Sequence, residues 1–197
     1  MVGPSRPEIV LFGSSIVQLS FAKEGWGAIL SHLYSRKADI VLRGYCGWNT
    51  RRALQVLDTI FPKVLQIAPS FSYPFTLIYC FNLLIKTHPF LLIQNLTLAN
   101  NFQSLSNKTR LVFLTAPPCN EVQIYGNRDG IHLTHEGSKI VVKEILNTLK
   151  EADWEPCLHW KSLPNEFGED SPYDPLGPDE KTINVASMTL LETMEYD

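Results

Sequence analysis

The sequence predicts an α/β fold of three layers, in which helices cover both faces of a parallel β-sheet. Short apolar, β-branched runs of the kind found in fully buried strands alternate along the chain with longer segments of helical periodicity. Strands that alternate with helices form parallel sheets with helices packed on each side. The chain has 197 residues, 45% hydrophobic and 19% charged, which is enough for one such domain and short for two.

The first strand is expected at residues 8–12, where a short apolar run stops at Gly13. Over residues 16–34 apolar side chains recur at helical spacing, which favours a helix after this strand. Gly25 and Gly27 lie inside that segment, and glycine disfavours a helix interior because it loses more backbone entropy than other residues. We therefore expect a helix in two parts.

Further strands and helices follow the same order. A second strand is expected at residues 39–43, before the turn-forming stretch 44–50 and a helix over about residues 51–61. A later strand at residues 110–115 stops before two prolines, which cannot continue a sheet ladder. Thr134 can then cap a helix that ends near Ala152. This alternation is the basis of the α/β prediction.

The middle of the chain differs in composition from the rest. No acidic residue occurs between Asp58 and Glu121, and residues 71–98 are rich in Phe, Leu, Ile and Pro. A membrane span is one interpretation of this stretch. However, the apolar run contains Asn82 and prolines and is interrupted at Lys86, whereas a span needs about 20 mainly apolar residues. We expect no membrane span.

Composition and charge argue against several classes of partner. The formal net charge is −3, and no cluster of Lys and Arg forms the footprint that a nucleic acid needs. Cys46, Cys80, Cys119 and Cys157 are far apart and form no CxxC pair, so neither a metal site nor a disulfide framework is expected. The first residues lack the apolar core of a signal peptide, from which we expect a cytoplasmic protein. Nothing in the sequence predicts the oligomeric state.

The carboxyl-terminal residues 153–197 form a tail to the domain expected over residues 1–152. This tail is rich in proline and acidic residues and has no sustained periodicity. Near its beginning it carries four large apolar side chains: Trp154, Leu158, Trp160 and Leu163. We expect these side chains to pack on the surface of the domain.

A candidate nucleophile follows the first predicted strand directly. Gly13, Ser14 and Ser15 connect that strand to the first predicted helix. This context places a hydroxyl at the carboxyl end of a strand, where open α/β sheets usually bind their ligands. The adjoining helix amino terminus also favours negative charge that develops beside the serine. Taken alone, such a turn is more typical of a helix cap than of a nucleophile.

A candidate acid and base precede the last predicted helix. Asp129 and His132 are three residues apart on a glycine-containing turn, so both side chains can point to the same side. A carboxylate that orients an imidazole, which then takes a proton from a serine, forms an acid–base–nucleophile relay. Taken alone, this pattern is more typical of a surface loop that begins a helix.

Taken together, the Gly-Ser-Ser after the first strand and the Asp-Gly-Ile-His before the last helix resemble the SGNH hydrolases of the GDSL esterase and lipase family. Residues 11–18, 43–50 and 129–134 are similar to the plant GDSL esterases related to isoamyl acetate-hydrolysing esterase. The resemblance covers about residues 1–63 and 109–197. It implies a flavodoxin-like three-layer α/β/α fold and a serine-dependent ester hydrolase.

The resemblance also implies a role for each matching residue. Ser15 matches the family nucleophile, His132 the base and Asp129 the acid of the triad. The backbone N–H groups of Ser15 and Gly47 match two donors of the oxyanion hole. Ser14 stands where many members have the Asp of Gly-Asp-Ser, which is not the triad acid. The implied substrates are small acyl esters, of the acetyl type, and no metal or organic cofactor is implied.

The chain departs from the family pattern in its middle. Family members carry a Gly-x-Asn-Asp block after the third strand, whose Asn is another oxyanion donor, and Asn82, Asn100 and Asn101 all lack its Gly and Asp. The stretch before Asp129 is also short for the family. We therefore expect an anomalous insert at about residues 70–101, a deletion at about residues 121–128 and an incomplete fold. The alternative function is a catalytically impaired relative that acts, if at all, by binding.

Overall fold

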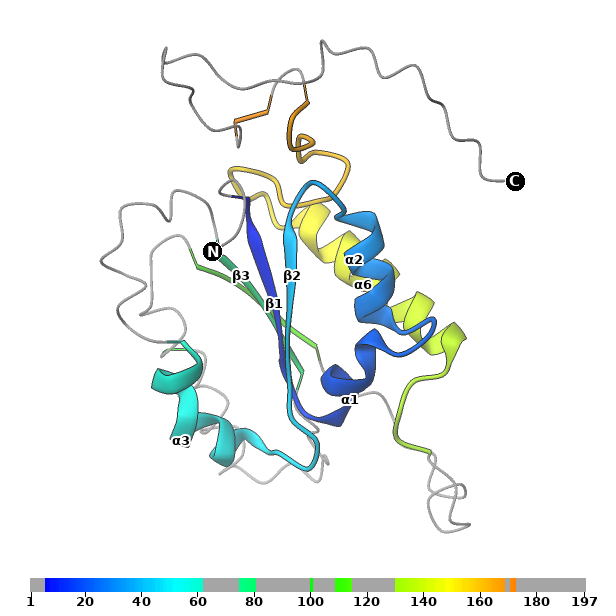
Figure 1. Cartoon of the computed structure of the whole chain (residues 1–197), viewed down its shortest axis with the longest axis vertical. Coiled ribbons are helices and arrows are strands. Elements are labelled where there is room, and N and C mark those ends of the chain that lie inside the picture. The colour runs from blue at the N-terminus through cyan, green and yellow to red at the C-terminus, as the bar shows by residue number, and fades with distance from the viewer. Residues whose placement is uncertain are drawn as a thin grey trace.

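The computed structural model describes residues 6–61, 75–80, 100, 109–114, 130–168 and 171–172. Four parallel strands form its sheet in the order β2-β1-β3-β4 (Figure 1). The strands are β1 (Glu8–Gly13), β2 (Asp39–Gly44), β3 (Phe75–Cys80) and β4 (Arg110–Phe113). The predicted parallel sheet is therefore confirmed, and β1 lies inside it.

The strand order reverses beside β1. The chain passes from β1 to β2 on one side of it and then to β3 on its other side, so the order changes direction between β1 and β3. Gly13, the last residue of β1, is in register with Gly44 of β2 and Cys80 of β3. In open α/β sheets, ligands bind outside the carboxyl ends of the strands at such a reversal. The residues that follow β1 occupy this position.

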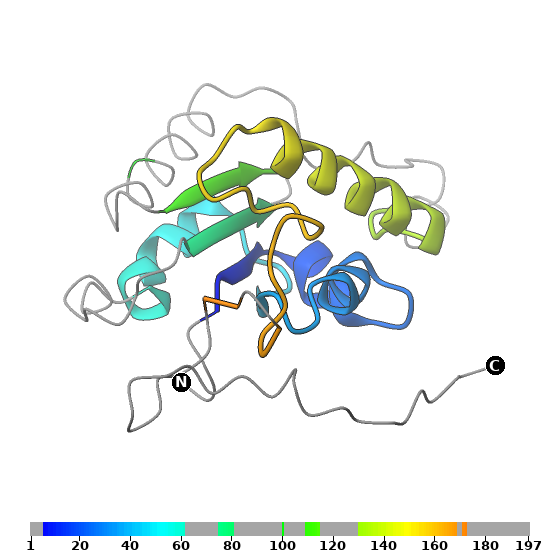
Figure 2. The ribbon, with the colours of Figure 1, turned by 90° about the horizontal axis from the view of Figure 1, so that it is seen from above.

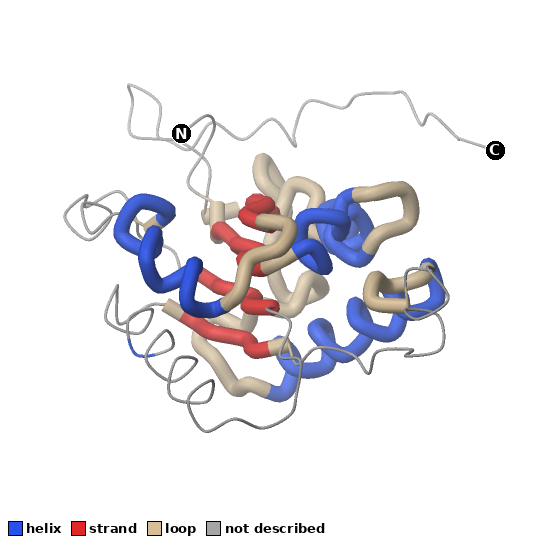
Figure 3. Tube along the Cα trace, turned by 90° about the horizontal axis from the view of Figure 1, so that it is seen from below, coloured by secondary structure: helices blue, strands red, loops and turns tan. Residues whose placement is uncertain are grey.

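Helices cover both faces of the sheet. The helices are α1 (Ser15–Gln18), the short 3-10 helix η1 (Leu19–Phe21), α2 (Trp26–Leu33), α3 (Thr50–Ile60) and α6 (His135–Glu151). Figures 2 and 3 show α2 and α6 on one side of the sheet and α3 on the other. These helices and the sheet make the predicted three layers.

The core follows the alternation of side chains along β1. Ile9 and Leu11 belong to a buried cluster with α2 and α6, whereas Val10 and Phe12 belong to a second buried cluster with α3. Successive side chains of a strand point to opposite faces, so a strand covered on both faces must be apolar throughout. This explains why β1 reads as a continuous apolar run.

The interrupted helix expected over residues 16–34 is a series of three short helices. Gly25 is the cap residue before α2 and Gly27 lies in its first turn, where η1 packs directly on the start of α2. A Cβ atom on either glycine would lie well under 3.0 Å from atoms of Ser20. The indole N–H of Trp26 donates to the carbonyl oxygen of Ile16 at 3.2 Å, which fixes α1 to α2. The close packing at these glycines, together with the low helix propensity of glycine, therefore interrupts the helix in this segment.

The last helix begins where the sequence predicts. Thr134 is its cap residue, and its hydroxyl oxygen accepts a hydrogen bond from the N–H of Gly137 at 3.2 Å. After α6 the chain returns across the amino ends of β1 and β2, at the top of Figure 1. We refer to residues 152–168 as the strap.

The strap packs into the domain rather than standing away from it. Leu158 and Leu163 are buried, and the hydroxyl of Tyr34 donates to the carbonyl oxygen of Leu158 at 2.8 Å. Burial raises the pKa of Tyr34, so this hydroxyl keeps its proton and remains a donor. Arg6 bridges Asp39 at the start of β2 and Glu166 in the strap. These contacts close the end of the sheet opposite Ser15.

The strand β3 is one that the sequence pattern does not indicate. It lies in the apolar stretch for which a membrane span was one interpretation. In the part of the chain that the structure describes, no helix has both the length and the apolarity to cross a membrane. The rest of the insert expected at about residues 70–101, except residue 100, and the deletion expected at about residues 121–128 lie outside the described residues.

Candidate active site

Ser15 is placed where the sequence predicts it. It is the first residue of α1 and follows β1 after one residue, Ser14, in extended conformation. The carbonyl oxygen of Ser14 accepts hydrogen bonds from the N–H groups of Val17 and Gln18 at 3.1 and 2.9 Å. Ser15 lies just below the surface, with 8% of its area accessible. Because α1 has only four residues, its dipole contributes little at Ser15.

Gly47 lies in the loop after β2, beside α1. The N–H of Cys46 donates to the side-chain Oε1 of Gln18 at 2.6 Å, and the N–H of Tyr45 donates to the carbonyl oxygen of Gly13 at 2.8 Å. These bonds fix the loop to both ends of the β1–α1 turn. Gly47 has a φ of 72°, in the left-handed region that favours glycine. The helix of the candidate nucleophile and the loop of the candidate amide donor are thus held together.

Gly44 positions these two elements, whereas the sequence pattern indicates only a turn glycine. A Cβ atom on Gly44 would lie well under 3.0 Å from the backbone nitrogen of Gln18. The end of α1 therefore packs directly against the backbone at the end of β2. The rings of Tyr45 and Trp48 stack at a centroid distance of 4.2 Å and further stabilise the loop. A glycine at the last position of the strand that lies beside the candidate nucleophile is the sequence signal that could have indicated this role.

His132 lies in the short loop between Gly130, which has a φ of 62°, and the cap of α6. Its Nε2 atom is buried. The side chain lines a cavity of about 250 Å³ together with Ile16, Trp26 and Leu133. Ile16 follows Ser15 in α1, so this cavity lies between the helix of Ser15 and the loop of His132. Ser15 itself does not line the cavity, and Asp129 lies outside the described residues.

A polar contact holds the start of α6 against the turn before α2. The Nδ1 atom of His135 is 3.5 Å from the carbonyl oxygen of Glu24 and 3.7 Å from its carboxylate Oε2. Glu24 has a φ of 61°, which turns the chain towards α2. Both residues line the cavity of His132. This contact therefore helps to set the distance between the His132 loop and the amino-terminal helices.

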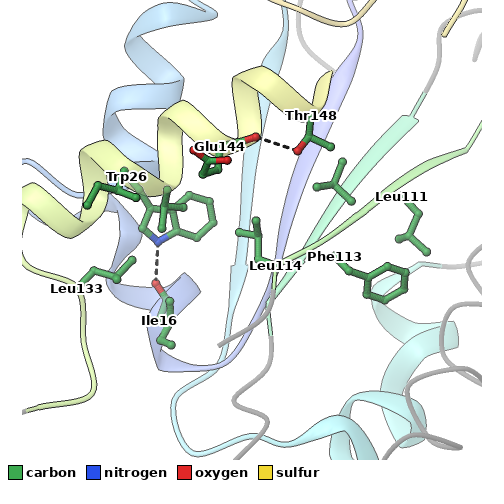
Figure 4. A pocket seen from close by; sticks show the side chains of 11 residues that line it. Ile16, Trp26, Leu111, Phe113, Leu114, Leu133, Glu144 and Thr148 are labelled. Carbon is green, nitrogen blue, oxygen red and sulfur yellow. Dashed lines mark hydrogen bonds between the residues drawn. The ribbon is translucent and has the colours of Figure 1, made fainter. Parts of the chain in front are cut away.

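A second cavity, of about 400 Å³, lies between β4 and α6. Figure 4 shows its lining, which includes Leu111, Phe113 and Leu114 from β4 and the residue after it, and Glu144 from α6. Ile16, Trp26 and Leu133 line this cavity as well as that of His132. The two hollows are therefore separated by these shared side chains.

Among the described residues, no group of three or more His, Cys, Asp or Glu side chains is placed to hold a metal ion. Cys46 and Cys157 are free thiols. The described side chains and amides offer a hydroxyl, an imidazole and backbone N–H groups, which are the components of acyl transfer.

Comparison with known proteins identifies the family. No protein-family model matches the chain. It is 41% identical to the GDSL esterase/lipase WDL1 of rice (Oryza sativa subsp. japonica) over 256 residues, an alignment that covers 98% of this chain and 97% of the relative. The chain belongs to the GDSL esterase/lipase family. The resemblance noted from its motifs is thereby confirmed, and this GDSL hydrolase is an enzyme that cleaves ester bonds.

Other relatives support the same assignment. This GDSL hydrolase is 39% identical to the GDSL esterase/lipase CPRD49 of Arabidopsis thaliana, over 100% of both chains. It also matches a mouse isoamyl acetate-hydrolyzing esterase 1 homolog, at 40% identity over 68 residues, or 34% of this chain. The rice protein and CPRD49 are thus matched along nearly the whole chain and the mouse protein only in part.

The alignments also reveal a difference in length. The alignment with the rice relative runs over 256 residues, whereas this chain has 197, so at least 59 residues of the relative have no counterpart here. Since the Arabidopsis alignment covers both chains completely, the unmatched residues lie inside the aligned region. This GDSL hydrolase is therefore shorter than these relatives within the aligned region.

Proposed function

We propose that this GDSL hydrolase cleaves esters of small acyl groups, of the acetyl type, with Ser15 as its nucleophile. The Oγ of Ser15 attacks the ester carbonyl while Nε2 of His132 takes its proton, and Asp129 orients His132. The N–H groups of Ser15 and Gly47 donate to the oxyanion. His132 returns the proton to the leaving alcohol, and water, with His132 again as base, releases the acid from the acyl-enzyme.

The observation that carries this proposal is the arrangement of Ser15 and Gly47. Both lie just beyond the carboxyl ends of neighbouring parallel strands, beside the reversal of strand order. The 2.6 Å hydrogen bond between Cys46 and Gln18 joins the loop of Gly47 to the helix of Ser15. A hydroxyl and a fixed backbone amide on one edge of the sheet are what an attack with oxyanion stabilisation requires.

The size of the cavity beside His132 supports a small acyl group. Its volume of about 250 Å³ is below the roughly 300–1,000 Å³ that is typical of pockets for larger organic ligands. Its lining combines apolar side chains such as Leu19 and Trp26 with His132. A short acyl chain fits such a space beside His132.

A second candidate function is binding without catalysis. It is favoured by the 59 or more interior residues that the rice relative has and this chain lacks. It is also favoured by the lack of a Gly-x-Asn-Asp block in the sequence. Removing one oxyanion donor typically lowers turnover by roughly 10²- to 10³-fold. In this alternative the chain binds an ester or a related ligand but does not hydrolyse it faster than the uncatalysed reaction in water.

Hydrolysis of p-nitrophenyl acetate by the full chain tests the proposal. The matched variants are Ser15→Ala and Ser14→Ala, because the two serines are adjacent, buried and equal in size. We expect Ser15→Ala to reduce hydrolysis to the background rate and Ser14→Ala to retain it. Equal rates for the wild type and Ser15→Ala, with circular dichroism showing both folded, would favour the binding alternative. A decanoate ester hydrolysed as fast as the acetate would contradict the small acyl preference.

A further inference from the structure

A groove on the far side of α6 from the apolar cavity of Figure 4 has no part in the proposed mechanism. Its volume is about 620 Å³, and it lies between α6, one residue of α2 and the strap. Its apolar part consists of Ile29, Val142 and Leu146, beside the ring of Trp160. Its charged part consists of four lysines: Lys139, Lys143, Lys150 and Lys161. We refer to it as the lysine groove.

The positive charge of the lysine groove is only partly compensated. Lys139 pairs with Glu136 at 3.1 Å, but Lys143, Lys150 and Lys161 form no ion pair with any described residue. Three of the four lysines share a face of α6, because they are spaced four and seven residues apart. Like charges on one helix face repel each other. An anionic group bound here would relieve that repulsion.

The charge of the lysine groove affects the neighbouring His159. Its pKa is lowered by partial burial and then by the nearby ammonium groups of Lys150 and Lys161. The backbone N–H of Lys161 donates to Nδ1 of His159 at 3.3 Å, so the neutral ring carries its proton on Nε2. The lysine groove therefore combines positive charge, a neutral imidazole and an apolar floor. Such a surface suits an anionic segment that also has apolar side chains.

The chain itself contains a segment of this kind. Residues 1–168 carry 16 Lys and Arg against 12 Asp and Glu, a formal charge of +4, whereas residues 169–197 carry one Lys against eight Asp and Glu, or −7; together they give the −3 of the whole chain. At its end, residues 188–197 interleave apolar with acidic side chains: Met188, Leu190, Glu192, Met194 and Glu195 are examples. The charge of residues 169–197 is thus opposite to that of the lysine groove.

The tail is long enough to reach the groove. The last residue that the structure describes is Pro172, next to the buried Ser171. The 15 residues between Pro172 and Met188 can span about 50 Å at roughly 3.3 Å each. The 17 residues of α6 are only about 25 Å long at 1.5 Å each. A tethered segment also needs only weak contacts, because tethering gives it a high effective concentration.

We propose that residues 188–197 bind the lysine groove of the same molecule, with their apolar side chains on its floor and their carboxylates on Lys143, Lys150 and Lys161. The groove is then an interaction surface for the acidic tail. It is separate from the ester-cleaving site, since neither Ser15 nor His132 lines it.

Zero-length carbodiimide cross-linking of the full chain, followed by mass spectrometry, tests this proposal. The protein is an equal mixture of ¹⁴N- and ¹⁵N-labelled molecules. We expect links from Lys143, Lys150 or Lys161 to Glu192 or Glu195, within single-isotope molecules, that disappear at high salt. Lys23, which is exposed and outside the groove, is the internal control. Links to Lys23 of equal yield, or links mainly between the two isotopes, would overturn binding within one molecule.

Amide hydrogen exchange gives an independent measurement. Reversing two charges in Glu192→Lys/Glu195→Lys should at least double the exchange rates of amides in the strap beside the groove. The matched variant Asp174→Lys/Asp179→Lys changes the net charge of the tail equally but outside residues 188–197. It should leave those rates unchanged. Equal increases in both variants, or no increase in either, would contradict a specific contact with residues 188–197.

Discussion

The two halves of the candidate active site are held in place by different kinds of contact. The serine half, formed by the β1–α1 turn and the loop of Gly47, is fixed by bonds between residues fewer than 40 positions apart, such as Gln18 with Cys46. The histidine half is docked by contacts that span more than 100 residues, such as His135 with Glu24. It also follows residues 121–128, where the sequence leads us to expect a deletion relative to the family.

This difference shows which half depends on the whole fold. Local contacts form as soon as β1, α1 and β2 pack, so the positions of Ser15 and Gly47 do not require the interior residues that relatives have and this chain lacks. The position of His132 requires α6 to dock on α2 and on the β1 and β4 side chains of the same buried cluster. We therefore expect any activity lower than that of the relatives to be caused by a displaced histidine half.

The largest expected effect comes from removing His132, the proposed base. His132→Ala should lower kcat/KM for p-nitrophenyl acetate by at least about 10³-fold, as the loss of a triad member does elsewhere. His135→Ala is the matched control, because His135 lines the same cavity. The variant loses only the exposed contact with Glu24, which should lower kcat/KM by at most about fivefold. Similar losses in both variants would show that the loop is disturbed as a whole and that His132 has no special role.

The next effect concerns stability of the serine half. Gly44→Ala should lower the free energy of unfolding by about 1–3 kcal/mol, because the new methyl group collides with the backbone of Gln18. Gly47→Ala should cost about 1 kcal/mol, since it meets no atom within 4 Å and only its left-handed φ is unfavourable. Urea unfolding monitored by circular dichroism measures both. A larger loss for Gly47→Ala would mean that α1 does not pack on Gly44 as described.

The cap of α6 offers a smaller and more selective change to the histidine half. Thr134→Ala should lower the free energy of unfolding by about 1 kcal/mol, because the N–H of Gly137 loses its acceptor. Thr134→Ser keeps the hydroxyl and should restore most of that stability. If the two variants unfold at the same urea concentration, the cap does not stabilise α6.

The smallest effect is electrostatic. Burial, together with the neighbouring carboxylate of Asp39, raises the pKa of Glu8 above its ordinary value of 4.5. A raised pKa in the folded state means that stability is highest with Glu8 protonated and is lost as the pH rises through that pKa. Glu8→Gln should therefore be more stable than the wild type at pH 7, by up to about 0.5 kcal/mol, and equal to it below about pH 4. Thermal unfolding at both pH values measures this, and a variant that is less stable at pH 7 would contradict it.

Much of the fold was predictable because its periodicities are local. The strands β1, β2 and β4, the interrupted helix and the cap at Thr134 all follow from patterns within a few residues. The strand β3 was not predictable in this way. It lies in a long apolar stretch that continues on both sides of it, so composition alone does not mark its ends, and its pairing with β1 and β4 sets its register. A membrane span and a buried strand share the same composition there.

In the candidate site, too, the features set by local sequence were predictable and those set by packing in three dimensions were not. A strand followed by Gly-Ser-Ser was enough to place Ser15, and the structure puts it where the sequence indicates. The roles of Gly44 and Gln18 could not be predicted, because they arise from the approach of α1 to β2 in three dimensions. The positions of Ser15, His132 and Asp129 relative to one another remain a prediction.

The strap has a consequence for how the molecule is made. Tyr34 and Leu158 are 124 residues apart in sequence, and Arg6 and Glu166 are 160 apart, yet each pair forms a hydrogen bond. Contacts of such long separation close late in folding, because the entropy of a large loop must be lost before they form. The amino end of the sheet is therefore closed only after residues 158–166 have been synthesised. Until then the buried apolar cluster that includes Leu158 and Leu163 is incomplete, which is when the nascent chain most needs protection from aggregation.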